Sequence, residues 1–270
     1  MTTNTGVTGI VQMGDCQVDI FGCSMKKLVE LLSSPEANEI VDTKCNHCGK
    51  PLQCMRVIQN VVACDACREK NDHDNRMRKC ADYWEHVCPE GFRNTDAAFP
   101  GFPATAYRDA LTKIKADNWK KSVFLFGPTG SGKTRVAFLI LKQTLVQTGK
   151  SVGVLWPEEI AGLKTHFDSS KFDRFAKYEA LLFDDSLLTA CREPKLLDTI
   201  KQLVDVRMRH NRVNIFTSQI AADGVKQGKD FGKADSTDLE RIEALFRRIS
   251  DTSIVVNLGT AIPQQDERPF

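Results

Sequence analysis

The sequence lacks long hydrophobic runs and has almost no net charge. Its longest uninterrupted apolar stretch is six residues, 136–141, whereas a membrane-spanning helix needs roughly 20. The N-terminal residues have neither the basic region nor the apolar stretch of a secretory signal, so we expect a cytoplasmic protein without a membrane span. The net charge of +2, from 37 basic and 35 acidic residues, is too small to predict nucleic-acid binding, which would need a local patch.

Cysteine is almost absent from the C-terminal two thirds of the chain. Cys191 alone follows residue 90, and the other nine cysteines stand at positions 16, 23, 45, 48, 54, 64, 67, 80 and 88. With 270 residues, 41% hydrophobic and 27% charged, the composition is that of a globular protein and excludes a disordered chain or a fibre. We therefore expect one large domain and one small cysteine-rich domain. In a reducing compartment such crowded cysteines favour metal ligation over disulfides.

Four of these cysteines form two pairs with metal-ligand spacing. Cys45-Asn-His-Cys48 and Cys64-Asp-Ala-Cys67 are separated by fifteen residues, which fits a known zinc-site pattern. Four thiolates complete the coordination of Zn²⁺, so the predicted role is structural and the module should fold only with metal. The other candidate ligands are isolated in the sequence: His47, Cys54, His73, Cys80 and Cys88.

Changes in composition and hydrophobic pattern along the chain predict its division into segments and domains. Residues 1–43 form an N-terminal segment, loosely ordered to about residue 22 and followed by a short helix capped by Ser24. The zinc module spans 44–68, a connecting helix and linker span 69–103, an α/β domain spans 104–260, and 261–270 are a tail. In the α/β domain five strands alternate with helices, at 123–126, 151–155, 180–184, 213–217 and 253–256. This alternation predicts a parallel sheet with helices on both faces.

A phosphate-binding loop follows the first of these strands. The pattern G-x-x-x-x-G-K-[ST] is matched by Gly127, Pro128, Thr129, Gly130, Ser131, Gly132, Lys133 and Thr134. The glycines let backbone N–H groups surround phosphates at the positive end of the next helix. We predict ATP binding, with Lys133 on the β- and γ-phosphates and Thr134 holding Mg²⁺.

Two carboxylates end the third strand. Asp184 and Asp185 follow an apolar run, which delivers acids to the carboxyl edge of a parallel sheet. Asp184 is the predicted Mg²⁺ partner. Asp185 is the candidate to orient or deprotonate the attacking water, although its side chain is one methylene shorter than the usual glutamate. The plainer alternative is that these acids only cap the strand end.

Taken in order, the motifs resemble those of one family. They are Ala106-Tyr-Arg-Asp, the phosphate loop, Leu181-Leu-Phe-Asp-Asp-Ser, Asn214-Ile-Phe-Thr-Ser-Gln219 and Ala244-Leu-Phe-Arg-Arg248-Ile. Over residues 104–258 the chain resembles the DnaC/DnaI helicase-loader and IstB transposition-helper group of AAA+ ATPases. The resemblance implies an α/β AAA+ P-loop NTPase fold with a parallel sheet of strand order 5-1-4-3-2, preceded here by a small zinc-ribbon-like domain. It also implies an ATPase that is weak in isolation, in the cytoplasm of a bacterial or phage-infected cell.

The resemblance assigns roles to further polar residues. It makes 214–219 the sensor strand, with the sensing residue open between Gln219 and Ser218, because the family usually has Asn where Gln219 stands. It makes Arg248 an arginine finger that crosses to the ATP of a neighbouring subunit, with Arg247 as the fallback, and so implies self-association. Against this, an arginine pair on a helix is more often a solvated or ion-paired face.

Basic and aromatic residues interleave between the second and third strands. They are Lys164, His166, Phe167, Lys171, Phe172, Arg174, Phe175, Lys177 and Tyr178. Cations can track phosphates while rings stack on unpaired bases, so the pattern suits single-stranded DNA. The same rings could equally form the core-facing stripe of helices packed on the sheet.

Together with these patterns, the resemblance implies an ATP-dependent loader of a hexameric replicative DNA helicase that binds single-stranded DNA through its ATPase domain. The zinc module contains few charges, which favours docking on a protein. The resemblance to DnaI-type loaders implies that its docking partner is the helicase. An IstB-like ATPase that regulates a transposase on duplex DNA is the nearest alternative. A third possibility is a non-catalytic adaptor or zinc-dependent transcription factor that uses nucleotide only as a structural ligand.

Overall fold

The computed structural model describes residues 10–13, 16–19, 39–55, 63–99, 101–160, 169–191, 194–220 and 236–259. The chain divides into two compact units, Met1–Met77 and Arg78–Phe270, and each is considered by itself. Three predictions fall outside the described residues: the short helix after Ser24, the tail 261–270, and the first part of the basic and aromatic segment.

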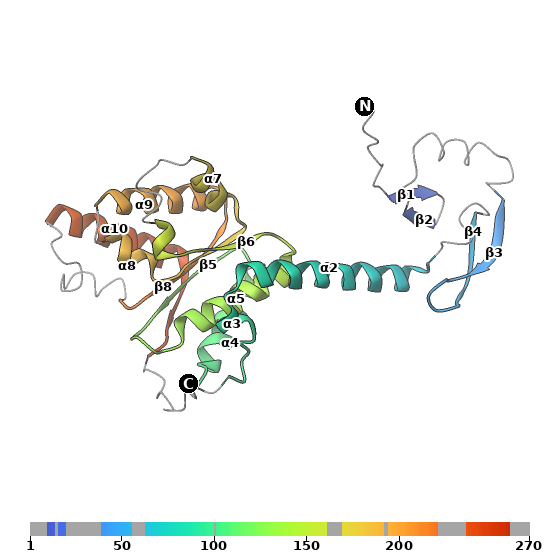
Figure 1. Cartoon of the computed structure of the whole chain (residues 1–270), viewed down its shortest axis with the longest axis horizontal. Helices are drawn as coiled ribbons and strands as arrows, with labels where there is room; N and C mark the ends of the chain where they lie inside the picture. Colours follow the sequence, from blue (N-terminus) through green and yellow to red (C-terminus); the bar gives the residue numbers. More distant parts are fainter. Residues whose placement is uncertain are drawn as a thin grey trace. The chain divides into compact units, whose positions relative to one another are not determined.

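The first unit contains two antiparallel hairpins (Figure 1). β1 (Ile10–Met13) pairs with β2 (Cys16–Asp19), and β3 (Ile40–Lys44) pairs with β4 (Pro51–Met55). The prediction of loose order up to residue 22 is therefore wrong for the first hairpin. The sequence between its strands is Gly14-Asp15, a dipeptide typical of two-residue hairpin loops, so a signal for the pairing was present.

The second unit is built on a five-stranded parallel sheet (Figure 1). In chain order its strands are β5 (Ser122–Phe126), β6 (Val152–Leu155), β7 (Ala180–Phe183), β8 (Val213–Ser218) and β9 (Ser253–Asn257). Their order in the sheet is β6-β7-β8-β5-β9, and every pair is parallel. This confirms the predicted order 5-1-4-3-2. The carboxyl ends of β5 and β8 are neighbours, so residues that follow these strands meet at one edge of the sheet.

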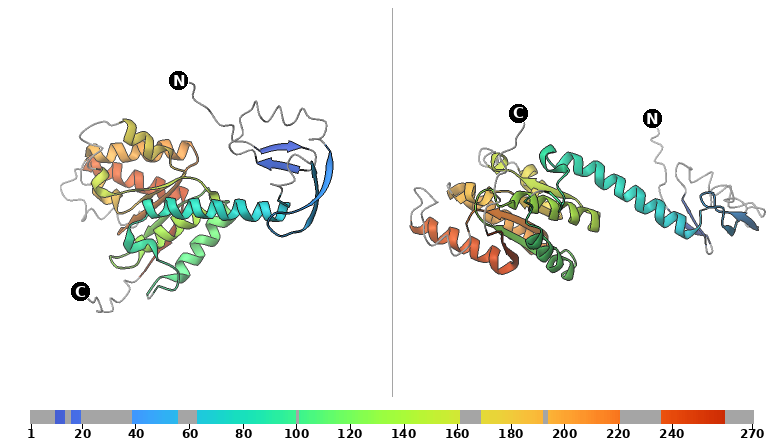
Figure 2. Two further views of the ribbon diagram at one scale, coloured as in Figure 1. Left: turned by 45° about the vertical axis from the view of Figure 1, so that its right-hand side comes forward. Right: turned by 90° about the horizontal axis from the view of Figure 1, so that it is seen from below.

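Helices cover both faces of this sheet (Figure 2). One face carries the end of α2 (Asp65–Val87) together with α3 (Glu90–Arg93), α4 (Ala104–Ala116) and α5 (Lys133–Thr148). The other carries α7 (Ser169–Lys177), α8 (Ser186–Cys191), α9 (Pro194–Arg209) and α10 (Ser236–Thr252). Alternate residues of a strand point to opposite faces, so Val123 and Leu125 join the first core and Phe124 the second. Within the described residues, no helix is both long and apolar enough to cross a membrane.

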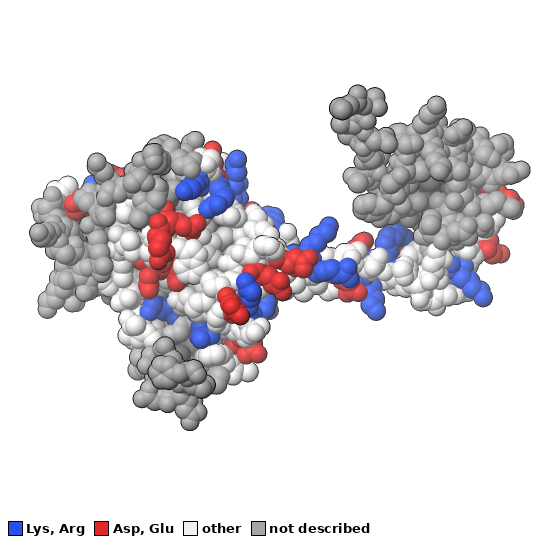
Figure 3. All heavy atoms as spheres, viewed as in Figure 1, with Lys and Arg blue, Asp and Glu red and all other residues white. Residues whose placement is uncertain are grey.

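Residues 78–103 lie within the second unit, which therefore begins before the boundary at 104 expected from the sequence. The Trp84 ring meets Phe138 of α5 edge-on at 6.2 Å, and Phe92 stacks on Phe138 at 4.8 Å. Cys80 and Cys88 are buried in the same core, which removes them as candidate zinc ligands. The remaining surface of α2 carries interspersed acidic and basic side chains (Figure 3). Because these charges dominate the sequence of the helix, its buried residues, Cys80 and Trp84, are hard to recognise from the sequence.

Candidate nucleotide site and candidate metal centre

The phosphate-binding loop joins the end of β5 to the start of α5. Gly130 and Gly132 have φ of +80° and +83°, a left-handed conformation that glycine adopts without steric cost. The Gly127 N–H donates to the Ser218 carbonyl at 3.2 Å and so fastens the loop to β8. The loop thus ends at a helix N-terminus, where unpaired N–H groups and the helix dipole favour an anion.

Lys133 lies inside this loop and is 6% exposed. Its Nζ donates to the carbonyls of Gly127 and Pro128 at 2.9 and 2.8 Å. Burial lowers the pKa of Lys133, and the nearby charges of Asp185 and Asp184 oppose that shift. In the described part of the chain no carboxylate forms an ion pair with this ammonium, so it can take a phosphate oxygen as its partner.

Asp184 is the centre of a hydrogen-bonded cluster at the carboxyl edge of the sheet. The hydroxyls of Thr134 and Thr217 both donate to Asp184 Oδ1 at 2.9 Å. Burial raises the pKa of Asp184, and these two hydrogen bonds oppose the shift. The two predicted Mg²⁺ ligands, Thr134 and Asp184, are therefore in contact. Carboxylate and hydroxyl oxygens are ligands that Mg²⁺ prefers, so these residues fit the ion.

Thr217 is a site residue that sequence reasoning did not find. Neither candidate for the sensing residue joins the cluster, because the Ser218 hydroxyl bonds the backbone two residues on and Gln219 is exposed. The available signal was strand register. Phe183 of β7 pairs with Phe216 of β8, which places the residues that follow them, an acid and a threonine, side by side.

Asp185 is held in a strained position next to this cluster. Its φ is +45°, in the left-handed region that non-glycine residues seldom adopt. Its backbone N–H donates to Thr217 Oγ1 at 2.8 Å. Its Oδ1 is buried and has no hydrogen-bond partner among the described residues, and the same holds for the Ser131 hydroxyl in the loop. Because unsatisfied buried polar atoms and backbone strain are costly, their retention together is typical of a functional site.

The two candidate finger arginines form surface ion pairs within one copy of the chain. Arg248 Nη1 donates to Asp205 of α9 at 2.6 Å, and Arg247 Nη2 donates to Glu243 at 2.6 Å. Their side chains are 53% and 66% exposed. This is the arrangement that the plainer alternative predicts, and the exposure leaves both guanidinium groups accessible to a second copy.

On α7 and directly after it, the aromatic residues pack against the core. Phe175 is 1% exposed, and Phe172 and Tyr178 pack against the same cluster. The cations of this segment are exposed: Lys171, Arg174 and Lys177. A ring as buried as Phe175 cannot stack on a base, so the described part of this segment supports the core interpretation of its rings.

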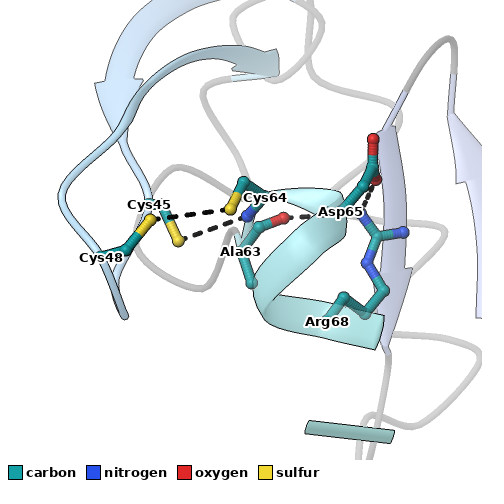
Figure 4. A network of polar contacts seen from close by, with 6 residues as sticks. All are labelled: Cys45, Cys48, Ala63, Cys64, Asp65 and Arg68. Carbon is teal, nitrogen blue, oxygen red and sulfur yellow. Dashed lines mark hydrogen bonds and ion pairs between the residues drawn. The ribbon is translucent and has the colours of Figure 1, made fainter. Parts of the chain in front are cut away.

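The four paired cysteines converge in the first unit, and Figure 4 shows three of them, Cys45, Cys48 and Cys64. Cys45 and Cys48 lie in the turn between β3 and β4, while Cys64 and Cys67 lie at the start of α2. Their sulfur atoms all lie within 4.8 Å of one another, and Sγ of Cys48 is 3.7 Å from Sγ of Cys64. Four sulfurs at about 2.3 Å from a tetrahedral Zn²⁺ would be about 3.8 Å apart. The cluster therefore fits the predicted ion.

Backbone groups favour the thiolate form of Cys45. The N–H groups of Cys64 and His47 donate to Cys45 Sγ at 3.3 and 3.5 Å. Backbone hydrogen bonds, above all that from Cys64, lower the pKa of Cys45 to about 5 against the opposing effect of burial, whereas the neighbouring thiols of Cys48 and Cys64 raise the pKa of Cys67 to about 12. Among the described residues the cluster contains the four cysteines alone. The imidazoles of His47 and His73 stay outside it, and the Cys54 side chain is not among the described ones.

Comparison with known proteins finds backbone likeness only. No family model and no curated protein matches the sequence. The crystal structure of DnaI is 19% identical, with 64% of this chain and 89% of that chain covered and a TM-score of 0.47. The DnaC helicase loader is 17% identical, with 63% and 99% covered and a TM-score of 0.48. AMPPCP-bound DnaA from Aquifex aeolicus is 15% identical, with 56% and 46% covered and a TM-score of 0.42. By its sheet order, its phosphate loop after β5 and its acids after β7, the second unit has the fold of an AAA+ P-loop domain.

Proposed function

We propose that this chain is an ATPase that loads a hexameric replicative DNA helicase onto single-stranded DNA. One observation carries the ATPase part: Thr134, from the phosphate loop, and Thr217, from β8, meet on the carboxylate of Asp184. A phosphate loop, a buried ammonium and a magnesium-type oxygen cluster thus occupy one edge of the sheet. That combination suits a nucleoside triphosphate with its metal ion.

Each residue of the site has a defined task in this proposal. The loop 127–134 holds the triphosphate, and Lys133 exchanges its two carbonyl partners for phosphate oxygens. Thr134 and Asp184 hold Mg²⁺, which when bound neutralises charge on the phosphates. Thr217 fixes the Asp184 carboxylate, and Asp185, with its unpartnered Oδ1, orients or deprotonates the attacking water.

Titration with a fluorescent ATP analogue tests the nucleotide site. Lys133→Ala should abolish binding because it removes the cation that meets the phosphates. Lys142→Ala, on the same helix α5 but outside the loop, should bind as the unmodified chain does. Equal affinity in both variants would remove the assignment of the phosphate loop.

In this proposal Arg248 completes the ATP site of a neighbouring copy. Arg248→Ala and Lys133→Ala subunits, each inactive alone, should partly restore hydrolysis when they are mixed, because each copy supplies the part that the other lacks. Arg247→Ala in place of Arg248→Ala is the matched control. A mixture as inactive as its components would argue against the finger.

The zinc module is the proposed docking element for the helicase. Its support is the spacing of the cysteine pairs, through which this part of the chain resembles DnaI-type loaders, together with the scarcity of charge between the pairs. The test is binding of the full chain, and of Cys64→Ser, to a hexameric replicative helicase with and without ATP. A complex that Cys64→Ser loses while it still binds ATP supports the loader. Filaments on duplex DNA without a helicase complex would favour the IstB-like regulator instead.

A further inference from the structure

A group of cations that the proposed function does not use lies at the amino edge of the sheet, the edge opposite the phosphate loop. Lys120 and Lys121 directly precede β5, and Arg212 directly precedes β8. The two strands are neighbours, and the Asn214 N–H donates to the Ser122 hydroxyl at 3.0 Å across their first residues. The chain segments that enter β5 and β8 therefore lie side by side.

Two helices add cations at the same edge. α4 ends just before β5 with Lys113 and Lys115 in its last turn, and α9 ends just before β8 with Arg209 in its last turn. We call the six residues the amino-edge patch: Lys113, Lys115, Lys120, Lys121, Arg209 and Arg212. Five of them are exposed and Arg212 is half-buried.

None of these six cations forms an ion pair with a described carboxylate. Some cations elsewhere on this unit are paired, as in Lys150–Glu179 and Arg248–Asp205, and others, such as Lys171 and Lys177, are not paired with any described carboxylate. Three acids precede strands at the same edge, namely Asp117 before β5, Glu179 before β7 and Asp251 before β9, and of these Glu179 forms an ion pair, with Lys150. The six cations of the patch outnumber these acids, so this edge of the sheet carries a net positive charge.

A buried cation strengthens this excess. Arg207 is fully buried, and its guanidinium donates at 2.6–2.8 Å to uncharged acceptors only, namely Asn214 Oδ1 and the carbonyls of Phe175, Tyr178 and Val213. Burial lowers the pKa of Arg207, and the neighbouring Arg212 charge lowers it further, with Glu179 opposing. Nη1 of Arg212 is itself buried without a partner among the described residues. Two guanidinium groups thus lie close together without a carboxylate partner.

Helix dipoles account for part of the patch. Lysine and arginine are favoured in the last turn of a helix, where the dipole is negative, and this explains Lys113, Lys115 and Arg209. Lys120, Lys121 and Arg212 lie beyond the helix ends and gain little from that effect, which falls off within one turn. These three residues need another explanation.

We propose that the amino-edge patch binds the phosphodiester backbone of a nucleic-acid strand. The expectation that this strand is single-stranded DNA rests on the proposed function. The ring nearest to the patch in the chain, Trp119, packs partly buried against the core, so the patch offers cations without a stacking platform. Contacts of this kind hold a strand by its phosphates and read no sequence.

The test is fluorescence anisotropy of labelled single-stranded and duplex oligonucleotides with the full chain over a series of salt concentrations. Lys120→Gln/Lys121→Gln removes two phosphate contacts, and each single-strand contact contributes about 0.7 to the log–log salt slope. We expect the slope to become shallower by about 1.4, and affinity at 0.1 M salt to fall about 25-fold. The matched control is Lys171→Gln/Lys177→Gln, the same charge change on α7. ATP binding should be unchanged in both variants, because neither pair belongs to the phosphate loop.

The possible results separate this proposal from the proposed function. Oligonucleotide binding that the α7 variant loses and the Lys120→Gln/Lys121→Gln variant keeps would overturn the patch and leave the loader intact. Binding of duplex only, with the expected loss in the Lys120→Gln/Lys121→Gln variant, would keep the patch and contradict the loader. Absence of any oligonucleotide binding by the unmodified chain would overturn both the patch and the DNA part of the proposed function, while the nucleotide site would stand.

Discussion

Replacing Thr217 by valine should both destabilise the second unit and weaken its binding of ATP with Mg²⁺. Valine keeps the shape of the side chain and removes the hydroxyl, and Thr217 is fully buried. The change therefore deletes two hydrogen bonds, the donation to Asp184 Oδ1 at 2.9 Å and the acceptance from the Asp185 N–H at 2.8 Å. Because the site is buried, solvent water does not supply substitute hydrogen bonds.

The magnitude follows from the type of each hydrogen bond. A hydrogen bond to a charged group contributes about 1.5–3 kcal/mol, and an orphaned buried N–H costs about 1–3 kcal/mol. Part of this is recovered by valine packing and by movement of Asp185, so we expect the free energy of unfolding to fall by about 2–4 kcal/mol. Without the Thr217 hydroxyl the pKa of Asp184 should rise further, because one of the two groups that oppose its upward shift is gone. A carboxyl that ionises less readily binds a cation less well.

Urea unfolding and MgATP titration measure the two effects. Thr144→Val is the matched control, because Thr144 is also buried but its hydroxyl only donates to the Ile140 carbonyl within α5, at 2.9 Å. That variant should lose about 1 kcal/mol or less and bind MgATP normally. If Thr217→Val matched the unmodified chain in both assays, or lost no more than Thr144→Val, the claim that Thr217 holds Asp184 would be refuted.

Three further predictions concern other parts of the chain. Burial raises the pKa of Cys191 to about 12, against 9.0 for a free thiol. Above pH 9 the unfolded thiol therefore loses its proton while the folded one keeps it, and unfolding free energy should fall with pH by up to about 1.4 kcal/mol per unit. Urea unfolding from pH 8.5 to 10.5 should show a shallower decline for Cys191→Ala, and parallel declines would contradict the assignment. Chelation of zinc should expose the β3–β4 hairpin to protease without loss of ATP binding, whereas unchanged protection would argue against a metal. Gly153→Ala should cost about 1–3 kcal/mol by overpacking, because its Cβ would come within 2.5 Å of the Tyr178 ring. In a double variant with Tyr178→Ala the two costs should be less than additive, and strict additivity would show that the ring is not the obstacle.

The features that the sequence predicts well are those encoded by short, local patterns. Lys133, Asp184 and the four zinc-type cysteines are recognisable because glycine spacing, a strand-terminal acid and paired thiols each have a direct mechanistic reason. The helix expected directly after the phosphate loop is found at Lys133–Thr148. The strand order came from resemblance rather than from the residues themselves.

The features that sequence reasoning does not reach depend on contacts between distant segments. Trp84 and Phe92 lie in a stretch rich in charge, and only their packing on Phe138 shows that this stretch belongs to the second unit. For Phe175 the periodicity fitted both a core stripe and a base-stacking surface, and burial decides for the core. Thr217 gains its role from a neighbour 33 positions away, which only strand register can reveal.

The geometry of the cysteine cluster does not depend on the length of the chain segment between its two cysteine pairs. Cys48 and Cys64 are 16 positions apart, and with zinc bound both ends of the intervening segment are held by the metal. The entropy of closing such a loop grows only with the logarithm of its length, so doubling the segment would cost about 0.6 kcal/mol. Insertions between the two pairs should therefore be tolerated, whereas an insertion inside either pair would move a sulfur out of reach. The module should therefore tolerate variation in the length of the intervening segment, but not in the spacing of the two cysteines within each pair.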